Sequence, residues 1–230
     1  MDTGLFIAAS GMVAEQTRQD QLSNDLANAS TPGYKPDEAP QHNFGEMLLA
    51  NTQTGQAIGS MSTGVQLGAS ATDLTQASVA DTGQPLDFAL TGSGFFSVQT
   101  TQGVRYTRNG QFSTNAQGEL VDGSGNKVLN QQGAAIRVQA DGHVPASALG
   151  VFDLSGAAKQ GNNLFTGKPT ASANPSVRQG ALEQSGVDAA KVMVDMISSM
   201  RAFQSGQQAI QSIDQTLQEA ATRVGTVTGS

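Results

Sequence analysis

Apolar residues recur with a helical period at both ends of this 230-residue chain, whereas the residues between them alternate as in β-strands. Near the start, the seam follows steps of three and four, with polar Glu15 and Gln19 at its centre. This pattern predicts one helix over residues 3–29, about 40 Å long. It should end at Thr31-Pro32-Gly33, because a residue before proline avoids helical dihedral angles and Pro-Gly favours a type II turn. The apolar positions of the seam are Leu5, Ala8, Met12, Leu22 and Leu26.

The last part of the chain returns to a helical period from Asp188 onward. A helix of about 36 residues would extend roughly 54 Å, and Ile197 and Ile213 widen its apolar stripe. Gly206 is expected to weaken this helix locally by about 1 kcal/mol. The stripe that we expect to be buried contains Met196, Met200, Phe203, Ile210 and Leu217.

Residues 84–165 alternate between apolar and polar positions and carry glycine-containing turns at the short spacing of β-hairpins. The sharpest hairpin prediction is Asn109-Gly110, which lies between Tyr106 and Phe112. These patterns predict an antiparallel β domain.

Residues 35–80 contain few large apolar side chains and predict an extended connector, with a short helical turn within Asn43–Thr52. The expected fold class is α+β, in which long N- and C-terminal helices form a coiled-coil-like layer beside the central antiparallel β-rich domain. The predicted parts are an N-terminal assembly helix and turn (1–34), a connector (35–83), the β-rich domain (84–182) and a C-terminal assembly helix (183–230).

Both predicted helices need a partner, because an amphipathic helix gains stability mainly when its apolar face is buried. Roughly ten large apolar side chains on the C-terminal stripe, at about 1.5–3 kcal/mol each, favour such burial. The helices could pair with each other within one chain as a stalk. They could equally pack against the same helices of other copies, and the pattern leaves both arrangements open.

Charge and composition limit the classes of partner and site that we expect for this chain. Twelve Lys and Arg residues against 19 Asp and Glu give a net charge of −7, and the bases are scattered singly from Arg18 to Arg223. We therefore expect no nucleic-acid partner, and no membrane insertion because no apolar run is long enough. The absence of cysteine excludes disulfides and thiolate metal sites. Because the first basic residue is Arg18, we expect a cytoplasmic chain or one exported without a Sec-type signal.

Catalytic motifs are not evident. The sequence contains no phosphate-binding loop, no HExxH and no GxSxG, and Gly92-Ser93-Gly94 lacks the third glycine of a dinucleotide site and predicts a turn. His42 and His143 are isolated and expected to be solvated, and Arg105 and Arg108 are expected on an exposed strand face. We predict that the chain is not an enzyme and has no catalytic residues, cofactor or metal.

The segment Leu26–Lys35, LANASTPGYK, resembles the hallmark motif of the bacterial flagellar rod and hook proteins. Two other regions agree with that family in the right order. Leu86–Val98 and Tyr106–Phe112 resemble its central β block, and Val177–Glu183 with Met196–Phe203 resemble its C-terminal signature. The motif positions are Leu26, Ala27, Asn28, Thr31, Pro32, Gly33 and Tyr34.

This resemblance implies a structural subunit of the flagellar basal-body rod, which self-assembles into a hollow helical drive shaft that transmits torque and conducts exported subunits. It implies export through the flagellum's type III machinery, a place in the cell envelope, and other rod and hook subunits as partners. Ser62–Val65 resembles the distal rod protein most closely. The alternatives are a hook or proximal-rod component, or a β domain on a helical stalk that binds or hydrolyses cell-wall glycan.

Overall fold

The computed structural model describes residues 2–38, 40–43, 46–50, 57–62, 64–139, 142–161, 163–172 and 176–227. The chain divides into two compact units. The first, called here the helical unit, consists of Met1–Leu26, Asp37–Ala71 and Ala189–Ser230. The second, the β unit, consists of Ala27–Pro36 and Thr72–Asp188.

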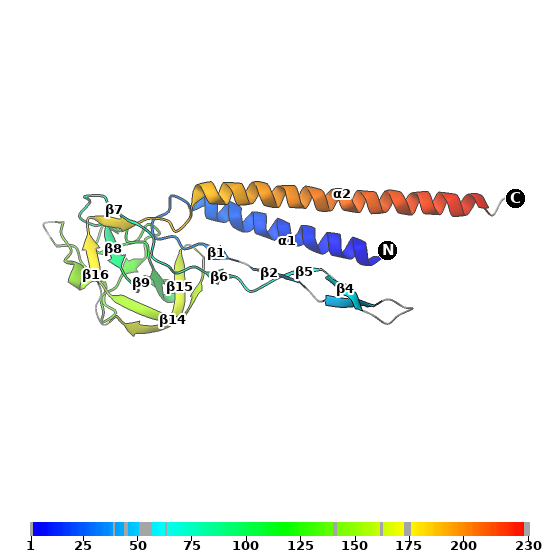
Figure 1. Cartoon of the computed structure of the whole chain (residues 1–230). Coiled ribbons are helices and arrows are strands. Elements are labelled where there is room, and N and C mark those ends of the chain that lie inside the picture. Colours follow the sequence, from blue (N-terminus) through cyan, green and yellow to red (C-terminus); the bar gives the residue numbers. More distant parts are fainter. Residues whose placement is uncertain are drawn as a thin grey trace. The chain divides into compact units, whose positions relative to one another are not determined.

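Two helices form most of the helical unit: α1 (Asp2–Ala27) and α2 (Ala189–Val227) (Figure 1). The Ser199 hydroxyl lies 2.6 Å from Oε2 of Glu15. Gly4, earlier in α1, instead lies beside Ile213, later in α2, so the two helices pack against each other antiparallel. Within the described residues, neither helix is long and apolar enough to cross a membrane.

Gly206 lies at a close contact between α2 and α1. A Cβ atom at Gly206 would lie only 2.8 Å from Cγ of Met12. The glycine therefore makes room for the methionine, in addition to its expected weakening of α2. From Val192 onward, a row of α2 positions spaced alternately four and three apart is half-buried or buried. These positions, called here the α2 seam, are Val192, Met196, Ser199, Phe203, Gly206, Ile210, Ile213 and Leu217.

The connector within the helical unit consists of antiparallel strand pairs rather than unpaired extended chain. The short helical turn predicted within Asn43–Thr52 is wrong where the structure describes that segment, because its residues pair as strands; residues 44–45 and 51–52 lie outside the described part. The connector also contacts α1, since the Val65 amide donates a hydrogen bond to Oγ of Ser10 at 3.3 Å. Its pairs are β1 (Asp37–Glu38) with β6 (Ala71–Thr72), β2 (Gln41–Asn43) with β5 (Val65–Leu67), and β3 (Glu46–Ala50) with β4 (Ala57–Ser62).

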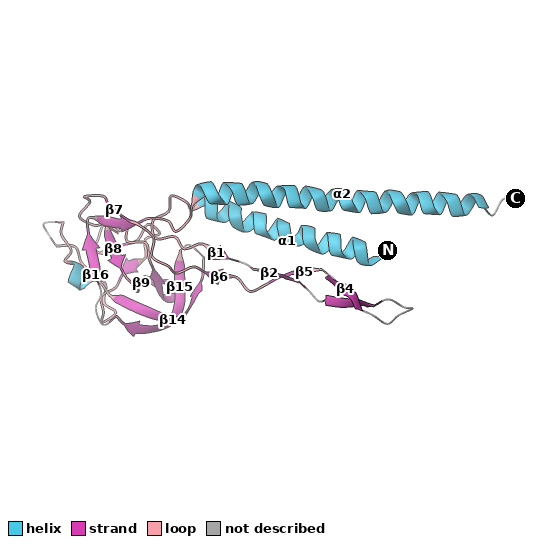
Figure 2. Cartoon of the chain, in the orientation of Figure 1, coloured by secondary structure: helices cyan, strands magenta, loops and turns pink. Residues whose placement is uncertain are grey.

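The β unit is an antiparallel structure around one seven-stranded sheet, with strand order β10-β15-β14-β9-β13-β12-β11 (Figure 2). β9 also pairs with β10, so β9, β10, β15 and β14 close into a ring. Two separate pairs, β8 with β16 and β7 with β17, complete the unit together with a short 3-10 helix at Ala146–Ala148. The sheet strands are β9 (Phe95–Thr100), β10 (Gly103–Thr107), β11 (Ser113–Thr114), β12 (Leu120–Val121), β13 (Lys127–Val128), β14 (Val151–Lys159) and β15 (Leu164–Ala171). The remaining strands are β7 (Val79–Asp81), β8 (Phe88–Thr91), β16 (Ser176–Gln179) and β17 (Ala181–Glu183).

Side-chain alternation along β9 divides the apolar interior into two clusters. Phe96 and Val98 point into the larger one, which also contains Phe88 and Val151. Phe95 points to the opposite face and packs with Phe165 at a ring-centroid distance of 5.1 Å. The predicted fold class, with terminal helices and a central antiparallel β-rich part, is confirmed at this level.

The hairpin predicted at Asn109-Gly110 is wrong. β10 pairs with β9 and β15, whereas β11 pairs with β12, and neither Asn109 nor Gly110 has the positive φ of a two-residue hairpin turn. Gly110 is required for another reason, because a Cβ there would lie 1.7 Å from the carbonyl oxygen of Phe88. The Asp122-Gly123 turn, in contrast, does join paired strands β12 and β13.

Candidate functional site

Residues 28–36, which follow α1 and are called here the motif loop, form a compact turn. The Tyr34 amide donates to the Thr31 carbonyl at 3.3 Å, and Gly33 has a φ of 65°, as the third position of a type II turn requires. A Cβ on Gly33 would lie 2.5 Å from the backbone carbonyl of Arg108. The glycine thus provides both the turn conformation and the close approach to the neighbouring chain.

The end of β14 and the loop that follows it contact the other side of this turn. The Lys159 ammonium lies 4.0 Å from the ring centroid of Tyr34, which is 4% exposed, and donates to the carbonyl of Lys35 at 2.8 Å. Asn163, the only described non-glycine residue with positive φ, donates from Nδ2 to the carbonyl of Pro32 at 3.2 Å. Lys159 and Asn163 therefore bind the motif loop through its backbone carbonyls and the Tyr34 ring.

The residues that precede α2 contact the same loop. The Gly33 amide donates to the Glu183 carbonyl at 2.9 Å, and the Gly186 amide donates to the Tyr34 carbonyl at 2.9 Å. The segment that follows α1 and the segment that leads into α2 are thus hydrogen-bonded to each other within the β unit.

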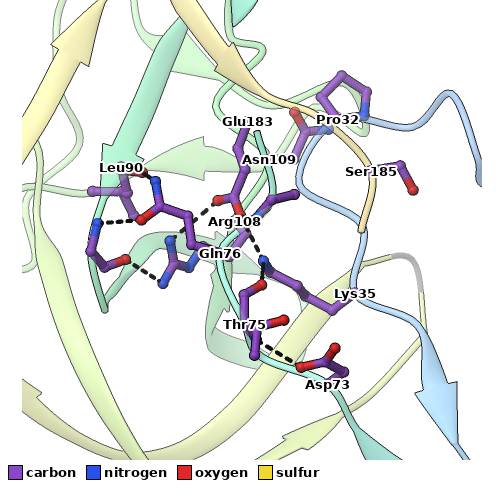
Figure 3. Close-up of polar contacts among 12 residues, drawn as sticks. Pro32, Lys35, Asp73, Thr75, Gln76, Leu90, Arg108, Asn109, Glu183 and Ser185 are labelled. Carbon is purple, nitrogen blue, oxygen red and sulfur yellow. Dashed lines mark hydrogen bonds and ion pairs between the residues drawn. The ribbon is translucent and has the colours of Figure 1, made fainter. Parts of the chain in front are cut away.

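Beneath the loop lies a buried ionic network, shown in Figure 3. The Lys35 ammonium is 2.6 Å from Oε1 of Glu183, and Nη1 of Arg108 is 3.2 Å from Oε2 of the same carboxylate. All three side chains are at least 97% buried. Lys35 also donates to the Thr75 carbonyl at 2.5 Å, and the Ala77 amide donates to Oε1 of Glu183 at 2.9 Å. Both carboxylate oxygens of Glu183 therefore accept hydrogen bonds.

The network holds two buried cations and one buried anion, and two further carboxylates lie near the cations. Burial lowers the pKa of the Arg108 guanidinium, an effect that the charges of Glu183 and Asp153 oppose. Hydrogen bonds from Thr75 hold the pKa of Asp73 below its ordinary value, with a smaller contribution from the Lys35 charge. Arg108 is also 5.2 Å from the Phe95 ring centroid and donates from Nη2 to the Gly92 carbonyl at 2.8 Å. These contacts join residues from separate parts of the chain, so the network is suited to holding those chain segments together.

The residues singled out on the predicted helices lie in several environments. Met12 packs against Gly206, and Leu22 and Leu26 are half-buried, but Leu5 is 40% exposed. On α2, Met200 is 49% exposed, whereas the neighbouring Ser199 is 1% exposed. The other four predicted stripe residues are half-buried and belong to the α2 seam: Met196, Phe203, Ile210 and Leu217.

Several residues of the network were missed by sequence reasoning. Arg108 was expected to be exposed, which is wrong, because Gly33 and Glu183 from distant parts of the chain cover it; Arg105 is half-buried. Lys35 and Glu183 lay in segments that matched the family but were not assigned a role. The only signal in the sequence was that the charged Glu183 directly follows the apolar pair Ala181-Leu182, and the structure shows all three residues buried in β17.

Three family models match this chain. Residues 5–35 match the model described as flagella basal body rod protein, residues 89–149 match the flagellar hook protein FlgE/F/G D1 domain, and residues 178–223 match the flagellar basal body rod FlgEFG protein C-terminal region. Whole-length relatives agree with these matches. The chain is 30% identical to the flagellar hook-basal body complex protein FlhO of Bacillus subtilis, with 97% of this chain and 99% of the relative covered.

The chain belongs to the flagellar basal-body rod protein family. It is also 30% identical to the flagellar basal-body rod protein FlgF of Caulobacter vibrioides, over 99% of this chain and 100% of the relative. For the flagellar basal-body rod protein FlgG of Bacillus subtilis, the identity is 30% over 94% and 96% of the two chains. Membership of the rod-protein family assigns the chain a structural role in the flagellar basal body.

The rod-protein matches also explain which parts of the chain the ionic network joins. Lys35 is the last residue of the first matched segment, Arg108 lies in the second, and Glu183 lies in the third. One buried carboxylate therefore binds together all three segments by which this rod-family chain is recognised.

Proposed function

We propose that this chain is a rod subunit that assembles with copies of itself, and with other rod and hook subunits, into a hollow helical shaft. Such a shaft would transmit torque and conduct exported subunits, and the subunit itself would leave the cell through the type III export machinery. The role is structural rather than catalytic. Of the rod subtypes, we favour the distal rod protein on the resemblance at Ser62–Val65, of which Thr63 lies outside the described residues.

The observation that carries this proposal is the apolar surface that α1 and α2 leave exposed. Large apolar side chains of a stable monomer are mostly covered, and an exposed group of them marks an interaction surface. On α1, Phe6 is 59% and Val13 is 62% exposed. The first turns of α2 carry four such residues outside the α2 seam, called here the outer α2 face: Met193 (49%), Val194 (65%), Ile197 (55%) and Met200 (49%).

Assembly of identical subunits through such faces gives an open helical polymer when the contacts are head-to-tail and do not close into a ring. In this proposal, α1 and α2 pair along the α2 seam in a coiled-coil-like layer within each subunit. The outer α2 face then packs against neighbouring subunits. In this proposal α2 pairs with α1 of its own chain through one face and packs against other copies through another face.

The β unit supports the mechanical part of the proposal. We propose that it folds as one domain made of Ala27–Pro36 and Thr72–Asp188, with the motif loop as an integral part. A buried carboxylate that binds two cations from distant segments resists separation of those segments, because pulling out one partner leaves an uncompensated buried charge. A subunit that transmits torque needs this property where the chain passes from its helices into the β unit.

The test is polymerisation of a variant with an altered outer α2 face. Ile197→Gln with Met200→Gln removes two apolar side chains worth about 1.5–3 kcal/mol each when buried, so the critical concentration for sedimentable polymer should rise at least about tenfold. The control is Ser198→Gln, which introduces the same side chain at an exposed polar position between them. Unchanged polymerisation of the double variant, or an equal loss in the control, would contradict the proposal.

A further inference from the structure

The α2 seam contains one polar side chain, Ser199, and it is almost completely buried. Its hydroxyl lies 2.6 Å from Oε2 of Glu15 and 3.2 Å from the Glu15 carbonyl oxygen. The second carboxylate oxygen, Oε1, accepts a hydrogen bond from Nε2 of Gln41 at 3.2 Å. The half-buried Glu15 side chain thus joins α1 to α2 and to β2 of the connector, all within the helical unit.

The rest of the seam offers no second place for this carboxylate. One heptad later along α2 lies Gly206, and one heptad earlier lies Val192. Neither side chain can donate a hydrogen bond, so a slip of one heptad in either direction would leave Glu15 against a position without a polar partner. The half-buried carboxylate would lose one of its two side-chain partners, at the cost of a net hydrogen bond. A single polar contact in an apolar seam is a well-attested way to select one register.

We propose that Glu15 is the register-determining residue of the α1–α2 pair: its contact with Ser199 selects the one alignment in which each subunit presents its helices for assembly. Gly206 cooperates, because only this alignment places Met12 against the position without a side chain. The inference rests on the pairing of α1 and α2 within one subunit that is part of the proposed function.

The cysteine-free chain allows a direct test by disulfide cross-linking of the full-length protein. The pair Gly4→Cys with Ile213→Cys reports the register seen here, since a Cβ on Gly4 lies 3.7 Å from Cδ1 of Ile213. The pair Gly4→Cys with Ala220→Cys reports a slip of one heptad. Each pair is introduced into the parent, into Glu15→Leu, and into the control Gln16→Leu, which alters an exposed neighbouring position. The assembled protein is oxidised mildly, and the disulfide yield is read after disassembly from the mass of the intact single chain.

In the parent and the Gln16→Leu control, the native pair should give most of the cross-linked product and the slipped pair only a small fraction. In Glu15→Leu, the ratio of slipped to native product should rise roughly three- to tenfold, the range expected for one net hydrogen bond. Glu15→Gln keeps an oxygen that can accept a hydrogen bond from Ser199, so it should restore the parental ratio. If Glu15 acted only through its charge, Glu15→Gln would behave like Glu15→Leu.

The outcomes separate the two proposals. If the native pair fails to cross-link even in the parent, the helices do not pair within the subunit and that part of the proposed function is wrong. If the native pair cross-links in the parent and Glu15→Leu leaves the ratio unchanged, the pairing stands and the register role of Glu15 is overturned.

Discussion

The two units of this molecule bury their side chains in opposite ways. The β unit encloses two apolar clusters and, beneath the motif loop, two cationic side chains that share one carboxylate. The helical unit has a narrow seam with a glycine and a serine at its centre, and it leaves Val194 and Ile197 more than half exposed. The first arrangement places its large apolar and charged side chains in the interior, whereas the second leaves large apolar side chains exposed along its helices.

The two units are therefore expected to be stabilised by different kinds of contact. Because removal of any of the three segments would leave a buried charge without its partner, we expect the β unit to unfold cooperatively. A thin helical seam buries little apolar area, so the helices depend on packing beyond their own pair. The two tyrosines of the chain, Tyr34 and Tyr106, are both buried in the β unit, so tyrosine emission follows this unit alone and helical circular dichroism mostly follows the other.

The largest effect is expected from Glu183→Gln. This change keeps the size of the side chain but removes the charged carboxylate that the buried Lys35 and Arg108 cations share, and it should destabilise the β unit by about 3–5 kcal/mol. Urea unfolding followed by tyrosine emission measures this loss. The matched control is Asp81→Asn, which breaks the exposed pair with Arg178 and should cost less than about 1 kcal/mol. Equal costs for the two variants would mean that the buried network does not stabilise the unit.

The next effect is expected from Gly33→Ala, which tests whether the motif loop belongs to the β unit. An added Cβ would combine left-handed strain with a 2.5 Å contact to the Arg108 carbonyl, at a total cost of about 2–3 kcal/mol. Gly118→Ala is the comparison, because Gly118 has a φ of 74° and no atom within 4 Å of a new Cβ. It isolates the strain alone, so Gly33→Ala should lower the tyrosine-detected transition further than Gly118→Ala does.

A smaller effect distinguishes two glycines of the helical unit. Gly11→Ala meets no atom within 4 Å and should stabilise α1 by about 0.8–1 kcal/mol through helix propensity. Gly206→Ala gains the same propensity but places a Cβ 2.8 Å from Cγ of Met12, so this gain should be cancelled or reversed. Thermal unfolding followed by helical circular dichroism compares the two. Equal stabilisation would show that Gly206 is not a close-packing position.

The smallest effect concerns pH. Because hydrogen bonds from Thr75 lower the pKa of Asp73 in the folded chain, the Asp73 carboxylate stabilises the β unit above its ordinary pKa of about 3.9. That contribution is lost as the pH falls through the lower folded-state value. Asp73→Asn should therefore be slightly less stable than the parent at neutral pH, and the difference should begin to shrink below about pH 4 and vanish below the lower folded-state pKa. A difference that persists in acid would contradict this origin.

The sequence predicted the parts whose signals are local. The period of the terminal helices, the stop at Pro32-Gly33 and the alternation along β9 each depend on neighbouring residues, and all three are present in the structure. The family followed from three short motifs in the right order, and the comparisons confirm it.

The contacts that form the ionic network could not be predicted in the same way. Alternation places Arg108 on one face of its strand but does not reveal that residues 33 and 183, which are distant in sequence, cover that face. Asn109-Gly110 has the composition of a hairpin turn, yet tertiary packing against the carbonyl of Phe88 determines its conformation. The polar Glu15 in the predicted seam was visible from the start, but its partner Ser199 is identified only by the antiparallel alignment of the two helices.

Hydrogen–deuterium exchange of the dilute full-length protein, repeated after polymerisation, tests the central contrast between the two units most directly. The account predicts that peptides covering residues 28–36 are protected in the dilute chain as strongly as the strands of the β unit. Peptides covering 189–227 should gain their protection mainly on assembly. Rapid exchange of residues 28–36 together with the helices in the dilute chain would contradict the account, because the motif loop would then not be part of the folded β unit.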